Sequence, residues 1–595
     1  MQFHELVTVF EQLNKNPKRL AKTDAVSKFL RTVPEKDTDD VIHFFSGRVF
    51  PEHDERHLGF STKLAIKAIA LAAATQPELV EETWKNEGDL GIAAEKILAK
   101  KRQKTLFGSA ELTIKKVAEN LRKLATQEGS GSVDQKLKLV AELLTSANPL
   151  EARYIIRSVL EDLRVGLGDG GVRDAIIWAY FGEQVGLKYD EEKNKITVEK
   201  KEEYDAIVEE VQMAYDLTVD FAEVVRTIKT SGRKGLTNVE LKPGRPVKVM
   251  LYQKADTIKE AFETVGTPAS IEYKYDGFRI LIHRDAETVK LFTRRLEDVS
   301  VQFPDVVALV KKHITSKHCI LDGEVVGIDK KTKRSIAFQQ ISQRIKRKYG
   351  IEKMVEELPI EVVVFDVLYA DGKTITAQPY QERKALLTKL VKNPAPGTLR
   401  LADASVVEDE QSAEKFYQEA LAAGNEGVMF KNLAGIYKPG ARVGYGVKVK
   451  PTLETLQLVI VGAEWGTGKR GNWLSSVILA CKGEDGELLE LGRVSTGLKD
   501  KEEEGFSYGQ LTELLKPLIT EEQGREVRVK PALVVQVDYE EIQSSPSYTS
   551  GFALRFPRFV GFREDLGPED INTIQDVQRF YNQQRGRDNK QNKTI

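Results

Sequence analysis

Apolar residues follow two different spacings along this chain, and the spacing changes near its middle. In the first ~220 residues they recur at helical intervals; Val133, Leu137, Val140 and Leu144, for example, fall on one face after a Gly-Ser linker that supplies a cap. From about residue 268 onward, short runs of β-branched and aromatic residues are bounded by glycine, which is typical of strands. The pattern predicts a helical first part and a strand-rich remainder.

Two composition shifts mark the expected domain borders. The segment 242–248 carries proline and glycine, and the extended residues before its prolines disfavour a continuing helix. Further on, short strands at 456–461, 477–480 and 488–494 alternate with a glycine-rich turn at 466–471, which suits a small barrel such as an OB-fold. A chain of 595 residues is also too long for one core. We predict three domains, 1–241, 242–451 and 452–595.

Composition narrows the classes of function. The net charge is −1 although 30% of the residues are charged, so any nucleic-acid binding depends on locally clustered cations. Cys319 and Cys481 lie far apart beside apolar residues, which excludes a disulfide framework and a four-cysteine zinc site. The chain begins without an apolar leader, and its most apolar helical stretch, 64–74, is about half the length that spans a bilayer. We expect a protein that stays inside the cell and does not enter membranes.

The hexapeptide Lys274-Tyr275-Asp276-Gly277-Phe278-Arg279 carries the densest candidate chemistry. Its flanks are β-branched, aromatic or aliphatic, so Lys274 and Asp276 should project on one face as a strand approaches a bend, which Gly277 permits. A neutral lysine amine is suited to attack a phosphate and an arginine to grip one, which indicates nucleotidyl transfer. The alternative interpretation is a charged β-hairpin on the surface.

Such chemistry also needs acids that hold a divalent metal, cations that neutralise phosphate and a surface on which a base stacks. Glu324 lies inside the apolar strand 320–326, where a carboxylate usually has a specific partner, so it is a candidate metal or ribose ligand. Phe365 lies in the core-type strand 361–369, where packing is the commonest role. Glu426, at a loop-to-strand transition, is a second carboxylate that could share a cation with Glu324.

Further cations follow at Arg442, Lys448 and Lys450. In Val447-Lys448-Val449-Lys450 the alternation places both lysines on one strand face, with the valines packed behind. A solvated edge strand rich in lysine is the alternative.

In their order and spacing, these segments resemble the nucleotidyltransferase signature of ATP-dependent DNA ligases and of their capping-enzyme and RNA-ligase relatives. The resemblance implies that Lys274 becomes covalently adenylylated by ATP and that Glu272 contacts the adenine amino group. It also implies that Phe365 stacks on the base and that Glu324 and Glu426 serve the ribose and magnesium. The cations that it assigns to ribose and phosphates are Arg279, Arg294, Arg442, Lys448 and Lys450.

The resemblance covers nearly the whole chain. Residues 156–171, which end in a glycine-rich turn, resemble the helical DNA-binding domain that precedes the catalytic core in archaeal and eukaryotic ligases, and the amides of that turn are suited to a DNA phosphate. The segment 551–559 resembles the last ligase motif, whose arginines, here Arg555 and Arg558, orient the pyrophosphate. The implied architecture is a multidomain α and α+β chain: an all-helical N-terminal DNA-binding domain, an adenylation (nucleotidyltransferase) domain of antiparallel sheets with helices, and a C-terminal OB-fold β-barrel with a tail.

The implied function is the sealing of nicks in duplex DNA through a covalent lysyl-AMP intermediate, in replication (Okazaki-fragment joining), repair and recombination. We expect a monomer that uses ATP and Mg²⁺ on nicked double-stranded DNA, in the cytoplasm at the nucleoid if archaeal and in the nucleus if eukaryotic. The alternatives are an mRNA capping enzyme that uses GTP, an RNA ligase, and a DNA-binding scaffold with a decayed site. The first leaves the helical part without a role, and the last conflicts with the presence of every charged group that the chemistry needs.

Two positions depart from the family pattern. Leu566 stands where a lysine usually follows Arg563-Glu564-Asp565, which weakens the assignment of pyrophosphate handling at the end of that motif. The tryptophan that is common before the paired lysines is absent around Tyr445-Gly446.

The segment Gln103-Lys104-Thr105-Leu106-Phe107 resembles the short peptides by which replication enzymes dock on a sliding clamp. In that resemblance Gln103 hydrogen-bonds in a small pocket, while Leu106 and Phe107 fill a larger one. The alternative is a loop whose two apolar side chains pack on the helical core.

Overall fold

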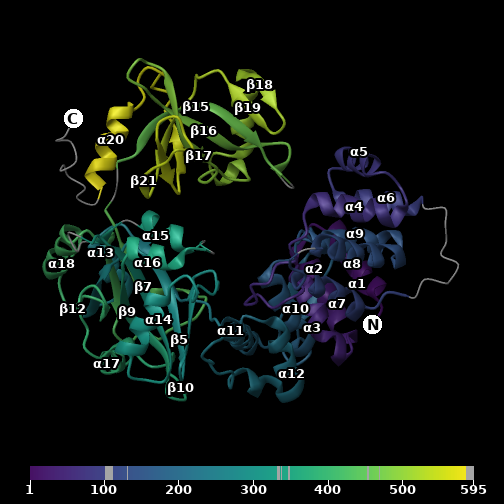
Figure 1. The fold of residues 1–595 in the computed structure, drawn as a ribbon, viewed down its shortest axis with the longest axis horizontal. Helices are drawn as coiled ribbons and strands as arrows, with labels where there is room; N and C mark the ends of the chain where they lie inside the picture. The colour runs from purple at the N-terminus through teal and green to yellow at the C-terminus, as the bar shows by residue number, and fades with distance from the viewer. Residues whose placement is uncertain are drawn as a thin grey trace.

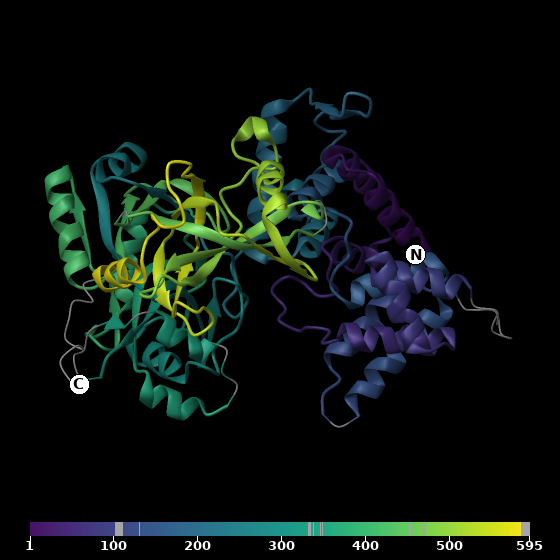
Figure 2. The same ribbon diagram turned by 90° about the horizontal axis from the view of Figure 1, so that it is seen from above.

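Three parts follow one another along the chain in the computed structural model (Figure 1). The helical part is drawn in purple and blue, the middle part in teal, and the C-terminal part in green and yellow above the middle part. Seen from above, the C-terminal part overlies the middle part (Figure 2). The structure describes residues 1–100, 111–129, 131–330, 335–336, 338–345, 347, 349–451, 454–467 and 470–584.

The first part is helical because amphipathic segments begin at capping side chains and bury one face. Helix α7 begins after Thr113, whose side chain accepts a hydrogen bond from a first-turn amide, and it buries Leu121. In α8, Val140 and Leu144 are buried as expected, whereas Val133, in the first turn, is 54% exposed. The helices are α1 (Phe3–Lys15), α2 (Arg19–Thr32), η1 (Glu35–Asp37), α3 (Thr38–Phe45), α4 (Thr62–Ala73), α5 (Pro77–Glu87), α6 (Leu90–Ala99), α7 (Ile114–Ala125), α8 (Ser132–Ser146), α9 (Pro149–Val159), α10 (Asp169–Phe181), α11 (Lys201–Thr218) and α12 (Phe221–Leu236).

One hairpin interrupts this helical part. Strands β1 (Lys188–Asp190) and β2 (Lys195–Thr197) pair antiparallel between α10 and α11. The part is therefore predominantly rather than entirely helical. The border that we predict after residue 241 falls between the end of α12 and the first strand of the middle part, β3 (Leu251–Ala255).

The middle part contains two sheets. One has the order β10-β9-β7-β5-β6, with β11 beside β9 and β8 beside β7; the other has the order β12-β4-β13-β14-β3. Most pairs are antiparallel, as predicted, and β11–β9 and β14–β3 are parallel. The remaining strands are β4 (Ala269–Lys274), β5 (Phe278–Asp285), β6 (Thr288–Thr293), β7 (His318–Ile328), β8 (Ser335–Ile336), β9 (Ile360–Ala370), β10 (Lys373–Thr374), β11 (Leu399–Leu401), β12 (Ala404–Val407), β13 (Gly427–Asn432) and β14 (Arg442–Val449). The helices are α13 (Ile258–Val265), α14 (Pro304–His313), α15 (Phe338–Ile345), α16 (Ile351–Glu357), α17 (Tyr380–Leu390) and α18 (Glu410–Ala422).

Strands β7 and β9 are almost continuously apolar because most of their side chains are buried in the core of the first sheet. Several charged residues interrupt the apolar strands of the two sheets, and three of them are Asp322 and Glu324 in β7 and Lys431 in β13. Each of these charges needs a polar partner. All three lie where the two sheets face one cavity or its immediate surroundings.

The C-terminal part is rich in strands, as predicted. Strand β15 is central, since it pairs with β16, β19 and β20. The elements are β15 (Leu456–Trp465), β16 (Leu474–Lys482), β17 (Leu488–Val494), η3 (Glu502–Glu504), α19 (Tyr508–Leu515), η4 (Lys516–Leu518), β18 (Ile519–Gln523), β19 (Glu526–Val529), β20 (Val534–Asp538), β21 (Glu541–Ser544), β22 (Phe552–Arg555), β23 (Arg558–Phe562) and α20 (Ile574–Gln583). Its assignment as an OB-fold stays a prediction. Within the described ranges, no helix has the length and apolar character to cross a membrane.

Candidate active site

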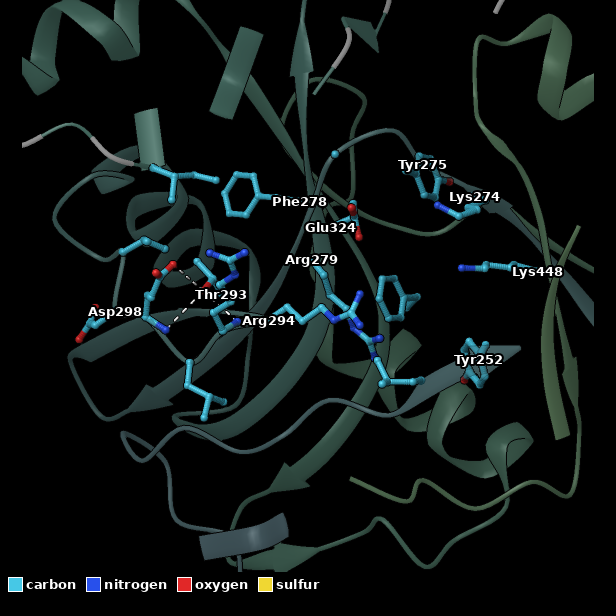
Figure 3. Close-up of a pocket in the computed structure, with 18 of the residues that line it drawn as sticks. Tyr252, Lys274, Tyr275, Phe278, Arg279, Thr293, Arg294, Asp298, Glu324 and Lys448 are labelled. Carbon is cyan, nitrogen blue, oxygen red and sulfur yellow. Dashed lines mark hydrogen bonds between the residues drawn. The ribbon is translucent and has the colours of Figure 1, made fainter. Parts of the chain in front are cut away.

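A cavity of about 1250 Å³ lies between the two sheets of the middle part. The helical part contributes the loop around residues 48–57 to its wall, and the C-terminal part contributes Arg555. Figure 3 shows Lys274 and Lys448 reaching into this cavity from one side, with Glu324 and Arg279 on the other. The cavity therefore gathers residues from three segments that are far apart in the sequence.

Lys274 ends strand β4 and reaches Glu426 across the sheet. Its Nζ donates a hydrogen bond to Glu426 Oε2, and Lys450 Nζ lies 2.9 Å from the same oxygen. Burial favours a higher pKa for Glu426, but the two ammonium groups lower that pKa to about 2. Glu426 is thus an ionised carboxylate that holds the Lys274 side chain in place.

Gly277, in the turn after Lys274, is required by close packing. A Cβ there would overlap the Val325 carbonyl oxygen of strand β7 and lie 2.9 Å from its carbon. The predicted bend therefore needs glycine because the turn passes directly against the neighbouring strand, which holds the turn and Lys274 beside β7.

Glu324 lies on β7 and lines the cavity. Burial raises its pKa to about 8, although Lys274 and Arg279 counteract the shift; Glu426 adds to it. A half-buried carboxylate beside a second one is suited to a hard cation with oxygen ligands. Among the residues that the structure describes, no set of three or more His, Cys, Asp or Glu side chains forms a metal cluster. Glu324 and Glu426 would be two carboxylate ligands, a number that is common for Mg²⁺ bound together with phosphates.

Glu272 is buried at one end of the cavity with three donors around it. Its carboxylate accepts hydrogen bonds from Tyr380 Oη, from Lys384 Nζ at 2.7 Å and from Lys431 Nζ at 2.5 Å. Burial favours a higher pKa, but Lys384 and Lys431 lower the pKa of Glu272 to about 2. Phe365 is half-buried in the cavity wall, with Lys431 Nζ 4.9 Å from its ring centroid. This end combines an aromatic face with a charge pair.

The partners of Glu272 are functional candidates that the sequence pattern did not bring forward. Lys431 lies inside the apolar strand 428–431, so the argument that selected Glu324 also applies to it. Tyr380 and Lys384 carry no such signal, because they lie one helical turn apart on α17, a helix in which polar and charged residues are common.

Arg279 enters the cavity with its charge already matched. It donates from Nε to Asp322 at 2.9 Å, from Nη2 to the same carboxylate at 2.5 Å, and from Nη1 to the Met250 carbonyl at 2.6 Å. Burial opposes the charge of the Arg279 guanidinium, and Asp322 raises its pKa. The sequence pattern singled out Glu324 from the Asp-Gly-Glu segment, whereas Asp322 is the carboxylate that is fully buried.

The remaining predicted phosphate ligands differ in their surroundings. Arg294, Arg442 and Lys448 line the cavity, and none has a carboxylate partner within ion-pair distance in the described part of the chain. Burial and the neighbouring Lys450 lower the pKa of Lys448. These side chains supply positive charge that the protein itself does not neutralise.

The two arginines of the last motif are separated. Arg555 lines the cavity and donates to Glu541 at 3.3 Å, whereas Arg558 lies on β23 with an exposed side chain and is not part of the lining. Between them, Phe556 has a φ of 49° and is 67% exposed. Lys450 Nζ also reaches Glu540 Oε2 at 3.4 Å, which joins the middle part to the C-terminal part.

The helical part contributes residues that no sequence pattern indicated. Arg48, Glu52, Asp54, Glu55 and His57 lie between α3 and α4 and line the cavity. Burial raises the pKa of Glu55 to about 7, and the middle-part carboxylates Asp298 and Glu297 raise it further. A loop without periodicity gives no sign of the distant surface that it will contact.

The glycine-rich turn at 166–171 borders a second, smaller cavity of about 230 Å³, lined by residues 45–47 and 163–168. Gly168 stands at the N-terminus of α10, where backbone amides face outward. In contrast to these outward-facing amides, the Arg157 side chain is buried and donates a hydrogen bond to Asp89 at 2.9 Å. Arg164 donates to the same carboxylate at 3.1 Å. The predicted clamp-binding residues Gln103, Leu106 and Phe107 lie outside the described residues.

Three family models match the chain in the order of its parts. They are the DNA ligase N terminus over residues 2–177, the ATP dependent DNA ligase domain over 249–450 and the ATP dependent DNA ligase C terminal region over 470–566. The DNA ligase of Nanoarchaeum equitans is 45% identical over 594 residues, 99% of this chain and 100% of that protein. The DNA ligase of Methanopyrus kandleri is 41% identical over 582 residues, 98% of this chain and 99% of that protein.

The solved structure described as Pmar-Lig_Pre matches with a TM-score of 0.55 at 16% identity, over 94% of this chain and 99% of that one, which shows the fold alone. Because this chain is more than 40% identical to these two DNA ligases over nearly its whole length, it belongs to the ATP-dependent DNA ligase family. It is an ATP-dependent DNA ligase of the type that these archaeal relatives represent, so the predicted family is confirmed and the capping-enzyme and scaffold alternatives fall away.

Proposed function

We propose that this protein seals nicks in duplex DNA through a lysyl-AMP intermediate on Lys274. The observation that carries the proposal is the position of Lys274 Nζ, which Glu426 holds at a cavity that also contains Arg294, Arg442 and Lys448, three cations without a carboxylate partner among the described residues. After the Lys274 ammonium has lost a proton, its amine attacks the α-phosphorus of ATP, an N–P bond forms, the bond from the α-phosphorus to the bridging oxygen breaks and pyrophosphate leaves. AMP then passes to the 5′-phosphate at the nick. The adjacent 3′-hydroxyl attacks that phosphate and AMP is released.

The base and the phosphates are assigned to different residues of the cavity. Phe365 offers the face on which adenine stacks, and Glu272 lies at the same end to accept from the adenine amino group. Arg294, Arg442 and Lys448 carry unmatched charge suited to the triphosphate. Lys450 shares the Glu426 carboxylate with Lys274, and Arg555 lines the cavity from the C-terminal part, where pyrophosphate would leave.

Mg²⁺ fits the pair of carboxylates formed by Glu324 and Glu426. Both are partly or largely buried, and the raised pKa of Glu324 reflects a charge that the protein alone does not balance. When bound, the ion would neutralise charge on the transferring phosphate. Glu324 and Glu426 would determine the position of the ion and so the place where the phosphate charge is neutralised.

The helical part is assigned to duplex binding, with the amides of the turn at 166–171 as one phosphate contact. Its match to the DNA ligase N terminus model supports this assignment. We extend the proposal to replication, including Okazaki-fragment joining, and to repair and recombination. The segment 103–107 would connect the enzyme to a sliding clamp.

The test is covalent labelling of the chain with α-labelled ATP. We expect the wild-type chain to carry label, Lys274→Ala to carry none, and Lys254→Ala to label normally, because Lys254 is 47% exposed on β3 and outside the cavity lining. Chasing the labelled chain with nicked DNA and, separately, with RNA ends distinguishes a DNA nick sealer from an RNA ligase. Label that persists in Lys274→Ala would place the nucleophile elsewhere.

A further inference from the structure

The cavity wall contains a contact that the proposed chemistry does not use, between Tyr252 and Gly446. A Cβ placed on Gly446 would overlap Cε1 and Cδ1 of the Tyr252 ring and lie 3.0 Å from Cζ. Gly446 is not among the glycines with positive φ, so the ring, and not the backbone conformation, requires glycine here. The tryptophan that the family pattern leads us to expect near this position is absent. Tyr252, from the neighbouring strand β3, fills the space in front of Gly446.

Tyr252 stands at the base end of the cavity. Gly446 is the direct cross-strand neighbour of Lys431, the residue that holds Glu272 and covers the Phe365 ring. Side chains of directly paired residues project on the same face of a sheet. Tyr252 lines the cavity together with Glu272 and Phe365. The ring is therefore part of the wall that a stacked base would meet.

The Tyr252 ring is fixed from behind and open in front. It packs against the apolar core that includes Met250 and Tyr437, and Figure 3 shows it beside Lys448, with Arg279 across the cavity. Burial and Asp366 raise the pKa of its phenol, so the hydroxyl keeps its proton. A rigid aromatic wall of this kind limits the shape of what binds beside it.

The charge pair at this end does not by itself distinguish adenine from guanine. Glu272 can accept from the 6-amino group of adenine or from the N1–H of guanine, while Lys431 can donate to adenine N1 or to guanine O6. The two bases also differ at C2, where guanine carries an amino group. Since Glu272 and Lys431 do not distinguish adenine from guanine, the distinction must come from the shape of the cavity wall around the base.

We propose that Tyr252, seated against Gly446, is the residue that selects ATP over GTP, by closing the base end of the cavity to a purine with a 2-amino group. This inference rests on the proposed nucleotide site and adds the residue that sets its base selectivity. A larger side chain at position 446 would displace the ring, so the two residues form one size-matched pair.

The experiment measures the rate of covalent labelling by α-labelled ATP and by α-labelled GTP. The wild-type chain should strongly favour ATP, and Tyr252→Ala should lower the ATP-over-GTP ratio by about tenfold or more, with the gain in GTP labelling as the distinguishing readout. Tyr252→Phe keeps the ring and should keep the ratio. Gly446→Ala should slow labelling by ATP, and adding Tyr252→Ala to it should remove that defect, because the overlap no longer exists.

Tyr252→Leu, which keeps an apolar side chain against the same core, replaces Tyr252→Ala should the latter fail to fold. Three results would overturn the inference. The ATP-over-GTP ratio could stay at its wild-type value in Tyr252→Ala or Tyr252→Leu, or the wild-type chain could label equally with both nucleotides. The third result is a loss of the ratio in Tyr252→Phe equal to that in Tyr252→Ala. Each of these results leaves Lys274-dependent labelling intact. Label that survives Lys274→Ala would instead overturn the proposed function itself.

Discussion

Lys274 and Glu426 are 152 positions apart in the chain, yet Lys274 Nζ donates to Glu426 Oε2. The pairing follows from strand order, because β13 lies beside β4 and places Gly427 opposite Lys274. Glu426 precedes β13, and its backbone amide donates to the Lys274 carbonyl at 2.8 Å. Lys274 and Glu426 are therefore joined through both their backbones and their side chains, which fixes the position of the Lys274 amine.

Glu324 should make metal dependence sensitive to pH. With its pKa raised to about 8, it is protonated below that value in the absence of a cation, and a divalent cation must displace the proton. The Mg²⁺ concentration for half-maximal adenylation should therefore rise up to roughly tenfold for each unit that pH falls below 8. Adenylation assays from pH 6 to 9 measure this, with Glu324→Gln as the variant that should lose the trend and adenylate more slowly.

The same pKa has a consequence for stability. The folded-state pKa of Glu324 lies above the unfolded value of 4.5, so metal-free stability should fall as pH rises from 4.5 to about 8 and level off beyond. Glu324→Gln should lack this contribution and gain stability relative to wild type over that window. Urea unfolding without metal at pH 5 and pH 9 tests it; an equal difference at both pH values would contradict the assignment.

The buried pair of Glu272 and Lys431 should be costly to break from one side. Lys431→Met removes one of the positive charges that offset the buried negative charge of Glu272, so it should destabilise the middle part by about 3 kcal/mol. Combining it with Glu272→Gln removes that negative charge as well and should restore much of the lost stability. Denaturant unfolding of both single variants and the double variant gives the coupling. Additive effects would show that the two charges do not depend on each other.

Arg555 and Arg558 offer a matched comparison within one motif. Because Arg555 lines the cavity, Arg555→Ala should slow adenylation about a hundredfold and lose little affinity for nicked DNA. Arg558 is exposed outside the lining, so Arg558→Ala should slow adenylation less. Single-turnover labelling and nick-binding titrations compare them. An equal defect in Arg558→Ala would mean that the C-terminal part turns to present Arg558 during the reaction.

Nick binding should depend strongly on salt. An enzyme that contacts six to ten phosphates loses about 10³- to 10⁵-fold in affinity between 50 and 200 mM salt, because binding releases counterions. Titrations of one nick in several sequence contexts should give the same slope, since phosphate contacts do not read bases. A shallow slope, or affinity that follows base sequence, would speak against binding through the backbone.

The segment 103–107 predicts a clamp effect separable from catalysis. Leu106→Ala combined with Phe107→Ala should reduce clamp-stimulated sealing while leaving adenylation and unstimulated sealing nearly unchanged, because anchor residues carry most of such binding energy. Sealing assays with and without the clamp measure this. Loss of thermal stability in the double variant would assign the two side chains to the core instead.

The sequence by itself determined the order of the parts and indicated the proposed chemistry. Lys274, Gly277 and Arg279 lie within six consecutive residues, so the roles proposed for them follow from local spacing. Glu324 was identifiable because a charge inside an apolar strand needs a partner. Periodicity also separated the helical part from the sheets, although it did not indicate the β1–β2 hairpin or the exposure of Val133.

Only the tertiary structure decided which charges meet. Strand order brings Glu426 to Lys274, and packing makes Asp322 the partner of Arg279. The entry of the loop at residues 48–57 into the cavity, and the fit of Tyr252 against Gly446, likewise depend on segments far apart in the chain. Local spacing fixes the direction of a side chain along its own strand or helix, whereas the identity of its neighbour depends on how distant elements pack, and that is a property of the whole fold.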